Sequence, residues 1–193
     1  MTAFERSFSL GFGTETDFRD NGRRLVIAHD LPLVDALFAE ECFSLLARHN
    51  RHLPLAVNIK ADGLQSLLKE AFDRHGIDNY FLFDMSVPDA IVSLNAGLRV
   101  FTRHSDVETV PAFYEQAVGV WMDAFFDDRW LTPEAIAAHL SAGKQVCLVS
   151  PELHKRPHLP FWERLRNSPI VADDRLMLCS DIPEDAVTFF QHA

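Results

Sequence analysis

The sequence predicts an α/β fold built from repeated strand and helix units. Three observations support this prediction: short apolar runs that recur along the chain, helix-start signals after many of them, and amphipathic stripes between them. The runs have the length and composition of buried parallel strands, and they cover residues 55–59, 80–83, 98–102, 119–122, 145–149 and 176–179. This alternation favours either a (β/α) barrel or a doubly wound sheet. Both place functional residues at the carboxyl ends of strands.

The predicted helix starts pair a capping side chain with an acid or amide three residues later. One further start is Thr132 before Pro133, because proline suits the first helical position. The residues from 64 to 72 carry an apolar stripe at helical spacing, and a helix covering residues 31–47 is also predicted, with Pro32 at its start. The four capping pairs that predict helix starts are Asp62 with Gln65, Ser86 with Asp89, Ser105 with Glu108, and Asp181 with Glu184.

The segment from residue 13 to residue 30 combines a strand with a hairpin. Glu15 and Asp17 are two residues apart, so on a strand both carboxylates face the same side. The signal Asp20-Asn21-Gly22 predicts a tight turn, and the apolar run that follows leads to His29. Two oxygen ligands suited to Mg²⁺ or Ca²⁺ and one proton carrier are therefore expected to converge.

Composition limits the other classes of function. A chain of 193 residues, 48% of them hydrophobic, is expected to form a single domain covering residues 1–193. The net charge of −10 and the lack of a basic cluster argue against nucleic-acid binding. The chain has no apolar stretch long enough to span a membrane and no secretory signal at its start. Three scattered cysteines, Cys42, Cys147 and Cys179, suggest a reducing, cytoplasmic setting.

The pattern Gly-x-x-x-Glu-x-Asp, then Asn21-Gly22, an apolar run and His29-Asp30, resembles the glycerophosphodiester phosphodiesterase family. That family lies in the superfamily of phosphatidylinositol-specific phospholipase C barrels. The stretch LPLAVNIK, residues 53–60, is similar to its third strand, and CSDIPEDA, from Cys179, is similar to its last strand and helix. The likeness spans nearly the whole chain. It implies a TIM-type barrel, a divalent metal, either Mg²⁺ or Ca²⁺, held by Glu15 and Asp17, His29 as a catalytic histidine, and Lys60 stabilising the phosphate charge.

Two departures from the family pattern modify this expectation. The family's first strand ends in a His-Arg-Gly motif, whereas this chain opens with the helix that follows that strand. We therefore expect about seven barrel strands with the first one missing, through a misassigned start or its loss, and an open edge that favours a homo-oligomer. Asn58 stands where the family has its third carboxylate ligand. Its amide oxygen can bind a hard cation but brings no charge to the metal. Asp84 is the nearest acid that would compensate.

Further candidates lie at other strand ends, where a surface role is about as plausible as a functional one. Arg103 would grip a phosphate bidentately, and either His104 or His154 would replace the missing histidine. The loop of residues 150–156 concentrates charge after a strand. The candidate substrate-binding residues are Arg103, Asp123, Glu152, His154 and Asp181.

Three functions remain open from the sequence. The first is a metal-dependent hydrolase of a small glycerol- or sugar-linked phosphodiester, in lipid metabolism. The second is a catalytically impaired barrel that binds a phosphorylated ligand in surface-polysaccharide or lipid metabolism. Asn58 and the missing histidine favour this second function. A weaker third option is an isomerase or lyase that uses Lys60 as a Schiff base.

Overall fold

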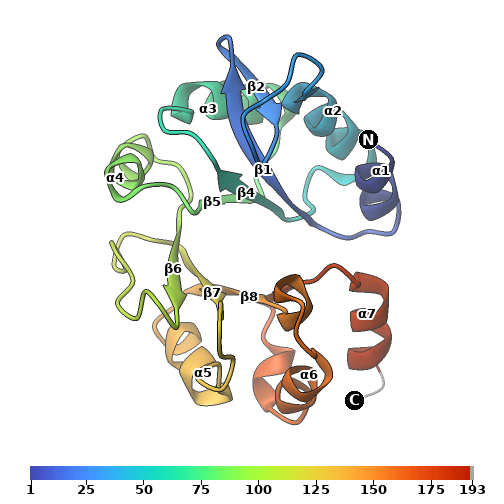
Figure 1. Ribbon diagram of the computed structural model, residues 1–193, viewed down its shortest axis with the longest axis vertical. Helices are drawn as coiled ribbons and strands as arrows, with labels where there is room; N and C mark the ends of the chain where they lie inside the picture. Colours follow the sequence, from blue (N-terminus) through green and yellow to red (C-terminus); the bar gives the residue numbers. More distant parts are fainter. Residues whose placement is uncertain (192–193) are drawn as a thin grey trace. The chain divides into compact units, whose positions relative to one another are not determined.

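The computed structural model describes residues 1–191, which divide into two compact units, one of residues 1–100 and one that begins at Phe101. Each unit is a sheet with its own helices and its own apolar core (Figure 1). The domain prediction of a single barrel remains a prediction. No helix within residues 1–191 is both long and apolar enough to cross a bilayer.

The first unit contains a five-stranded sheet in the order β3-β2-β1-β4-β5. Strands β1, β4 and β5 run parallel, and β2 and β3 extend the sheet antiparallel. Its elements are α1 (Thr2–Ser9), β1 (Thr14–Asn21), β2 (Arg24–Ile27), β3 (Leu37–Phe38), α2 (Ala39–Asn50), β4 (Leu55–Ile59), α3 (Gln65–His75), β5 (Tyr80–Phe83) and α4 (Val87–Asn95).

The second unit contains a four-stranded parallel sheet in the order β6-β7-β8-β9. With β1, β4 and β5, the described residues therefore contain seven parallel strands, the number predicted from the sequence. The elements of the second unit are β6 (Phe101–Ser105), β7 (Gly119–Asp123), α5 (Pro133–Ser141), β8 (Gln145–Val149), the 3₁₀ turn η1 (Pro151–His154), α6 (Leu159–Arg166), the 3₁₀ turn η2 (Pro169–Ala172), β9 (Leu176–Cys179) and α7 (Pro183–Gln191).

The core of the first unit forms where helices α1, α2 and α3 cover one face of the sheet. Phe18 on β1 is fully buried and stacks on Phe43 of α2, with ring centroids 5.6 Å apart. Val57 of β4 and Leu68 of α3 are also fully buried in this cluster. Apolar burial of this kind is the main source of stability for such a unit.

The turn between β1 and β2 is the one the sequence predicts. Asn21 pairs with Arg24, so the loop has two residues, Gly22 and Arg23. Both have positive φ, 57° and 68°. A two-residue hairpin loop of the primed type requires this conformation at both positions.

In the second unit, Gly119 allows β7 to lie close to its neighbours. A Cβ atom at this position would lie 2.4 Å from the Phe101 ring and 2.8 Å from the Gln145 carbonyl oxygen. Phe101 is 1% exposed, so its ring has little room to move aside. The strand can therefore approach β6 and β8 only without a side chain at residue 119.

One predicted helix is absent, and another begins later than predicted. Ser105 accepts hydrogen bonds from the backbone N–H groups of Val107 and Glu108, at 3.1 and 2.7 Å, but no helix follows. The hydroxyl closes a local turn, which offers the backbone the same bonds that a helix cap does. The helix predicted over residues 31–47 begins only at Ala39, after an exposed segment that includes Leu31, at 80%, and Leu33, at 73%.

The other helix starts agree with the sequence in position, although not always in the capping residue. Ser86 accepts from the Asp89 amide, and Thr132 accepts from the Ala135 amide. Helix α3 begins at Gln65 without a side-chain cap, because Asp62 instead accepts a hydrogen bond from Ser86 at 2.9 Å.

Replacing Phe43 by alanine should lower the free energy of unfolding by about 3–5 kcal/mol, because removal of the stacked ring leaves a cavity that the surrounding core cannot fill. Phe126→Ala is the matched control. That ring is 80% exposed, so its loss should change stability by less than about 0.5 kcal/mol. Urea denaturation of both variants measures the difference. Similar losses for the two variants would contradict the packing of Phe43.

Candidate functional site

The alternation of β1 separates the core residues from the candidate site. Phe18 faces the helices, so Glu15 and Asp17 face the other side of the sheet. Neither is fully exposed, because both belong to the half-buried class of side chains. The two carboxylates predicted to share a face therefore do share one.

Parallel pairing brings Asn58 of β4 and Lys60, the residue that follows β4, to this face. Asp17 lies opposite Asn58 in the register, and the amide of Lys60 donates to the carbonyl of Phe18 at 3.0 Å. The Lys60 ammonium lies 3.4 Å from Asp17 Oδ1. Of the predicted site residues, Glu15, Asp17, Asn58 and Lys60 are thus assembled by two neighbouring strands.

The electrostatics of this cluster raise the pKa of Glu15 to about 7. Burial is the largest cause, followed by the negative charge of Asp17. A hydrogen bond from Asn58 and the charge of Lys60 act in the opposite direction, and Asp84 adds a smaller upward contribution. Asp84 follows β5 and has a φ of 64°, in the left-handed region. The cluster is therefore short of positive charge.

Asn58 is a second feature of this cluster that a bound cation would stabilise. Its Oδ1 atom is buried and makes no hydrogen bond to any described residue. A buried polar oxygen without a partner is costly. Together with Glu15 and Asp17 it forms a set of hard oxygen donors, the type that Mg²⁺ and Ca²⁺ prefer. The residues fit a divalent metal by donor chemistry, although no group of three or more His, Cys, Asp or Glu within residues 1–191 has metal-binding geometry.

His29 lies close to this cluster by its backbone, but its side chain interacts elsewhere. The amide of Ala28 donates to the carbonyl of Asp17 at 3.1 Å. The His29 side chain is 72% exposed, and its Nδ1 atom lies 3.0 Å from the Asp30 carboxylate. The predicted convergence with the carboxylates stays a prediction.

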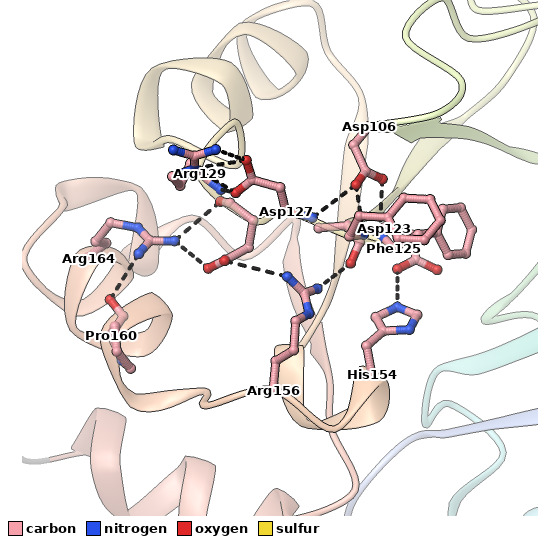
Figure 2. A network of polar contacts seen from close by, with 12 residues as sticks. Asp106, Asp123, Phe125, Asp127, Arg129, His154, Arg156, Pro160 and Arg164 are labelled. Carbon is pink, nitrogen blue, oxygen red and sulfur yellow. Dashed lines mark hydrogen bonds and ion pairs between the residues drawn. The ribbon is translucent and has the colours of Figure 1, made fainter.

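In the second unit, Asp123 and His154 form a close pair. Asp123 ends β7, His154 ends the turn after β8, and His154 Nε2 lies 2.6 Å from Asp123 Oδ1 (Figure 2). The Phe125 ring packs edge-on against the imidazole. A carboxylate that bonds one ring nitrogen orients the imidazole and fixes its tautomer. The Asp123 carboxylate therefore holds the His154 imidazole in one orientation.

The other predicted substrate-binding residues have protein partners or lie on the surface. The Nε and Nη2 groups of Arg103 both contact Glu108 Oε2, at 2.9 and 2.8 Å, so its guanidinium is already paired with a carboxylate. Glu152 accepts hydrogen bonds from Ser150 and Ser180. Asp181 lies on an exposed position after β9. Phosphate binding by Arg103 would require it to exchange Glu108 for the ligand.

The loop after β7 is held by one acid. Asp106 accepts from the backbone N–H groups of Phe125, Phe126 and Asp127, at 2.7 to 3.0 Å (Figure 2). Loss of hydration acts to raise the pKa of Asp106, but these three bonds lower it overall. Arg156 also contacts this loop through the carbonyl of Ala124. The loop carrying Phe125 is therefore well ordered beside His154.

Sequence reasoning missed a relay of two histidines and a tyrosine in the second unit. Tyr114 Oη lies 2.9 Å from His139 Nδ1, and His139 Nε2 lies 3.0 Å from His104 Nδ1. Burial, followed by the charge of His104, lowers the pKa of His139 to about 4. The signal was present, because Ile136, His139 and Leu140 follow the helical spacing of an inward-facing stripe.

The raised pKa of Glu15 predicts a pH dependence of stability. The folded state holds a proton between pH 4.5 and about 7 that the unfolded state has released, so the free energy of unfolding falls as pH rises through this window. Glu15→Gln removes that loss. In EDTA, the variant should gain roughly 2–3 kcal/mol relative to the wild type between pH 5 and pH 8.

Glu163→Gln, at an exposed position of α6, controls for the removal of one surface charge. Guanidinium denaturation at both pH values supplies the measurement. The assignment is contradicted if the difference between Glu15→Gln and the wild type is the same at pH 5 and pH 8.

Comparison with solved structures identifies proteins of the same fold. The chain matches the crystal structure of a glycerophosphodiester phosphodiesterase from Parabacteroides distasonis with a TM-score of 0.70 and 15% identity, covering 99% of this chain and 89% of that one. It matches a glycerophosphodiester phosphodiesterase from Agrobacterium tumefaciens with a TM-score of 0.64 and 13% identity, covering 100% and 92%. No protein-family model and no curated protein sequence matches the chain. The resemblance seen in the sequence is therefore confirmed in the fold: the chain has the same α/β fold as these glycerophosphodiester phosphodiesterases.

Proposed function

We propose that this protein is a metal-dependent hydrolase of small phosphodiesters in which the ester carries glycerol or a sugar. The single observation that carries the proposal is the cluster of Glu15, Asp17, Asn58 and Lys60 on one face of β1 and β4. Hard oxygen donors beside one ammonium group suit a phosphodiester bound with a divalent cation. The fold shared with glycerophosphodiester phosphodiesterases supports the same reaction class.

Each residue of the cluster has a distinct part in this proposal. Glu15, Asp17 and the Asn58 amide oxygen would hold Mg²⁺ or Ca²⁺, which supplies charge neutralisation at the phosphoryl oxygens when bound. Lys60 would exchange part of its contact with Asp17 for a non-bridging phosphate oxygen. A water oxygen attacks the phosphorus and releases a proton to the solvent, and the ester P–O bond breaks. His29 gives its proton to the leaving alkoxide oxygen, which requires its side chain to turn from Asp30 toward the substrate.

A second candidate function is favoured by a specific observation. The His29 imidazole is largely exposed and paired with Asp30, and the amide of Asn58 brings no charge where a third carboxylate would strengthen metal binding. Both features suit a barrel that binds a phosphorylated ligand without cleaving it. Open strand edges would also support a homo-oligomer in either case.

Turnover of glycerophosphocholine tests the first function. We expect hydrolysis with Mg²⁺ or Ca²⁺ and none with EDTA. Asp17→Asn and Lys60→Met should each lower kcat/KM by at least about 100-fold, because the first weakens metal binding and the second removes a positive charge beside the reacting phosphate. Glu163→Gln, distant in the sequence and exposed, should have the activity of the wild type. The absence of metal-dependent turnover of glycerophosphocholine and of bis(p-nitrophenyl) phosphate would exclude hydrolysis of this class.

Calorimetry separates the two functions. Titration of glycerol 3-phosphate in the presence of Mg²⁺ should give a saturable heat that Lys60→Met removes. Binding of glycerol 3-phosphate without turnover of glycerophosphocholine supports the ligand-binding barrel. Binding of glycerol 3-phosphate together with turnover of glycerophosphocholine supports the enzyme, provided that His29→Ala lowers this turnover by at least about 100-fold. If neither phosphate nor metal produces heat, both functions fail.

A further inference from the structure

The first unit contains a cavity of about 380 Å³ that is separate from the acidic cluster. It lies where β2 and β3 meet helices α2 and α3 (β2, α2 and α3 are labelled in Figure 1). Leu25 of β2 lines it and lies on the same sheet face as Phe18, the face that packs on the helices. Glu15 and Asp17 face the opposite side. The two sites therefore do not share a face of the sheet.

The floor of this cavity is apolar. Leu25 and Phe38 come from the strands, Phe43 from α2, and Leu67 and Ala71 from α3. Phe43 and Ala71 belong to the buried core, so this floor is a fixed surface. Its volume is that of a small-molecule site, because such pockets typically measure a few hundred cubic ångströms. An apolar body of modest length would fill it.

The rim of the cavity carries three arginines, and two of them have no acidic partner. Arg74 pairs with Glu40, at 3.2 Å. Among the ion pairs of residues 1–191, none involves Arg23 or Arg24; the Arg24 guanidinium lies instead over the Phe38 ring, 3.5 Å from its centroid. In a protein with a net charge of −10, unpaired arginines beside an apolar cavity form a local site for an anion.

Arg23 occupies a backbone position that does not suit it. Its φ of 68° is in the left-handed region, where glycine, asparagine and aspartate are favoured in a two-residue hairpin loop. An arginine here costs the turn some stability. Its side chain lines the cavity, so the position is explained if the guanidinium has a role that asparagine or glycine could not fill.

We propose that this cavity, which we call the arginine-rimmed cavity, binds a small amphiphilic anion: an alkyl body on the Leu25 and Phe38 floor with a phosphate or carboxylate head held by Arg23 and Arg24. Two acids line the cavity: Glu40 is paired with Arg74, and Glu70 opposes the head group and sets a limit on its affinity. The shared chemistry is an apolar chain that ends in a negative charge. This site is independent of the proposed hydrolase site, because Asp17 and Lys60 take no part in it.

Calorimetric titration with octyl phosphate, kept below its micelle-forming concentration, tests the proposal. We expect saturable 1:1 binding of octyl phosphate and of octanoate, with octanol and inorganic phosphate each at least about tenfold weaker, because each lacks one half of the recognised chemistry. Stronger binding of octyl phosphate would identify a phosphate head, and stronger binding of octanoate a carboxylate head. If no alkyl anion binds saturably, or octanol binds as tightly, the proposal is wrong.

Variants locate the site and distinguish binding there from nonspecific binding of octyl phosphate to the protein surface. Arg23→Asn and Arg24→Gln should each weaken octyl phosphate binding by about tenfold, whereas Glu70→Gln should strengthen it. Arg23→Asn should not lower the Tm, because asparagine tolerates the left-handed conformation. Arg48→Gln on α2, outside the cavity lining, is the matched control with unchanged affinity.

Two further results decide the matter. Amide chemical shifts of residues 22–25 should move on titration, and Asp17→Asn should retain the affinity of the wild type, which keeps this site distinct from the hydrolase proposal. Unchanged affinity in both Arg23→Asn and Arg24→Gln would overturn the assignment of the head-group site.

Discussion

The register between β1 and β4 is the constraint on which the first unit depends. Phe18 is fully buried under α2, and Val57 is fully buried in the same core. Since side chains alternate along a strand, this burial also fixes Glu15, Asp17 and Asn58 on the opposite face. A slip of one residue would send the carboxylates into the apolar core. The hydrophobic core thus determines the position of the acidic cluster.

The same constraint explains why the elements of the cluster were predictable from the sequence. Glu15 and Asp17 are two residues apart, Gly22 marks the turn, and residues 55–59 are apolar, so local patterns suffice. What the sequence could not supply was the state of each side chain. The exposure of His29 and its contact with Asp30 depend on side-chain placement that no spacing rule encodes.

The error at Ser105 arises because polar side chains make the same local bonds in different structures. Ser105 and Ser86 each precede an acid by three residues, yet Ser105 closes a turn and Ser86 caps a helix. His139 was not predicted as a site residue, and its partners, Tyr114 and His104, are 25 and 35 residues away. Contacts of that range are set by tertiary packing.

Gly119 has a consequence for how this sequence can change over evolutionary time. Because Phe101 and the Gln145 carbonyl occupy the space where its Cβ would lie, residue 119 cannot acquire a side chain while Phe101 remains large. Moving the carbonyl would require breaking the pairing of β7 with β8. A smaller residue at position 101 would relieve only one of the two contacts, so glycine is required at position 119 for as long as these two strands pair.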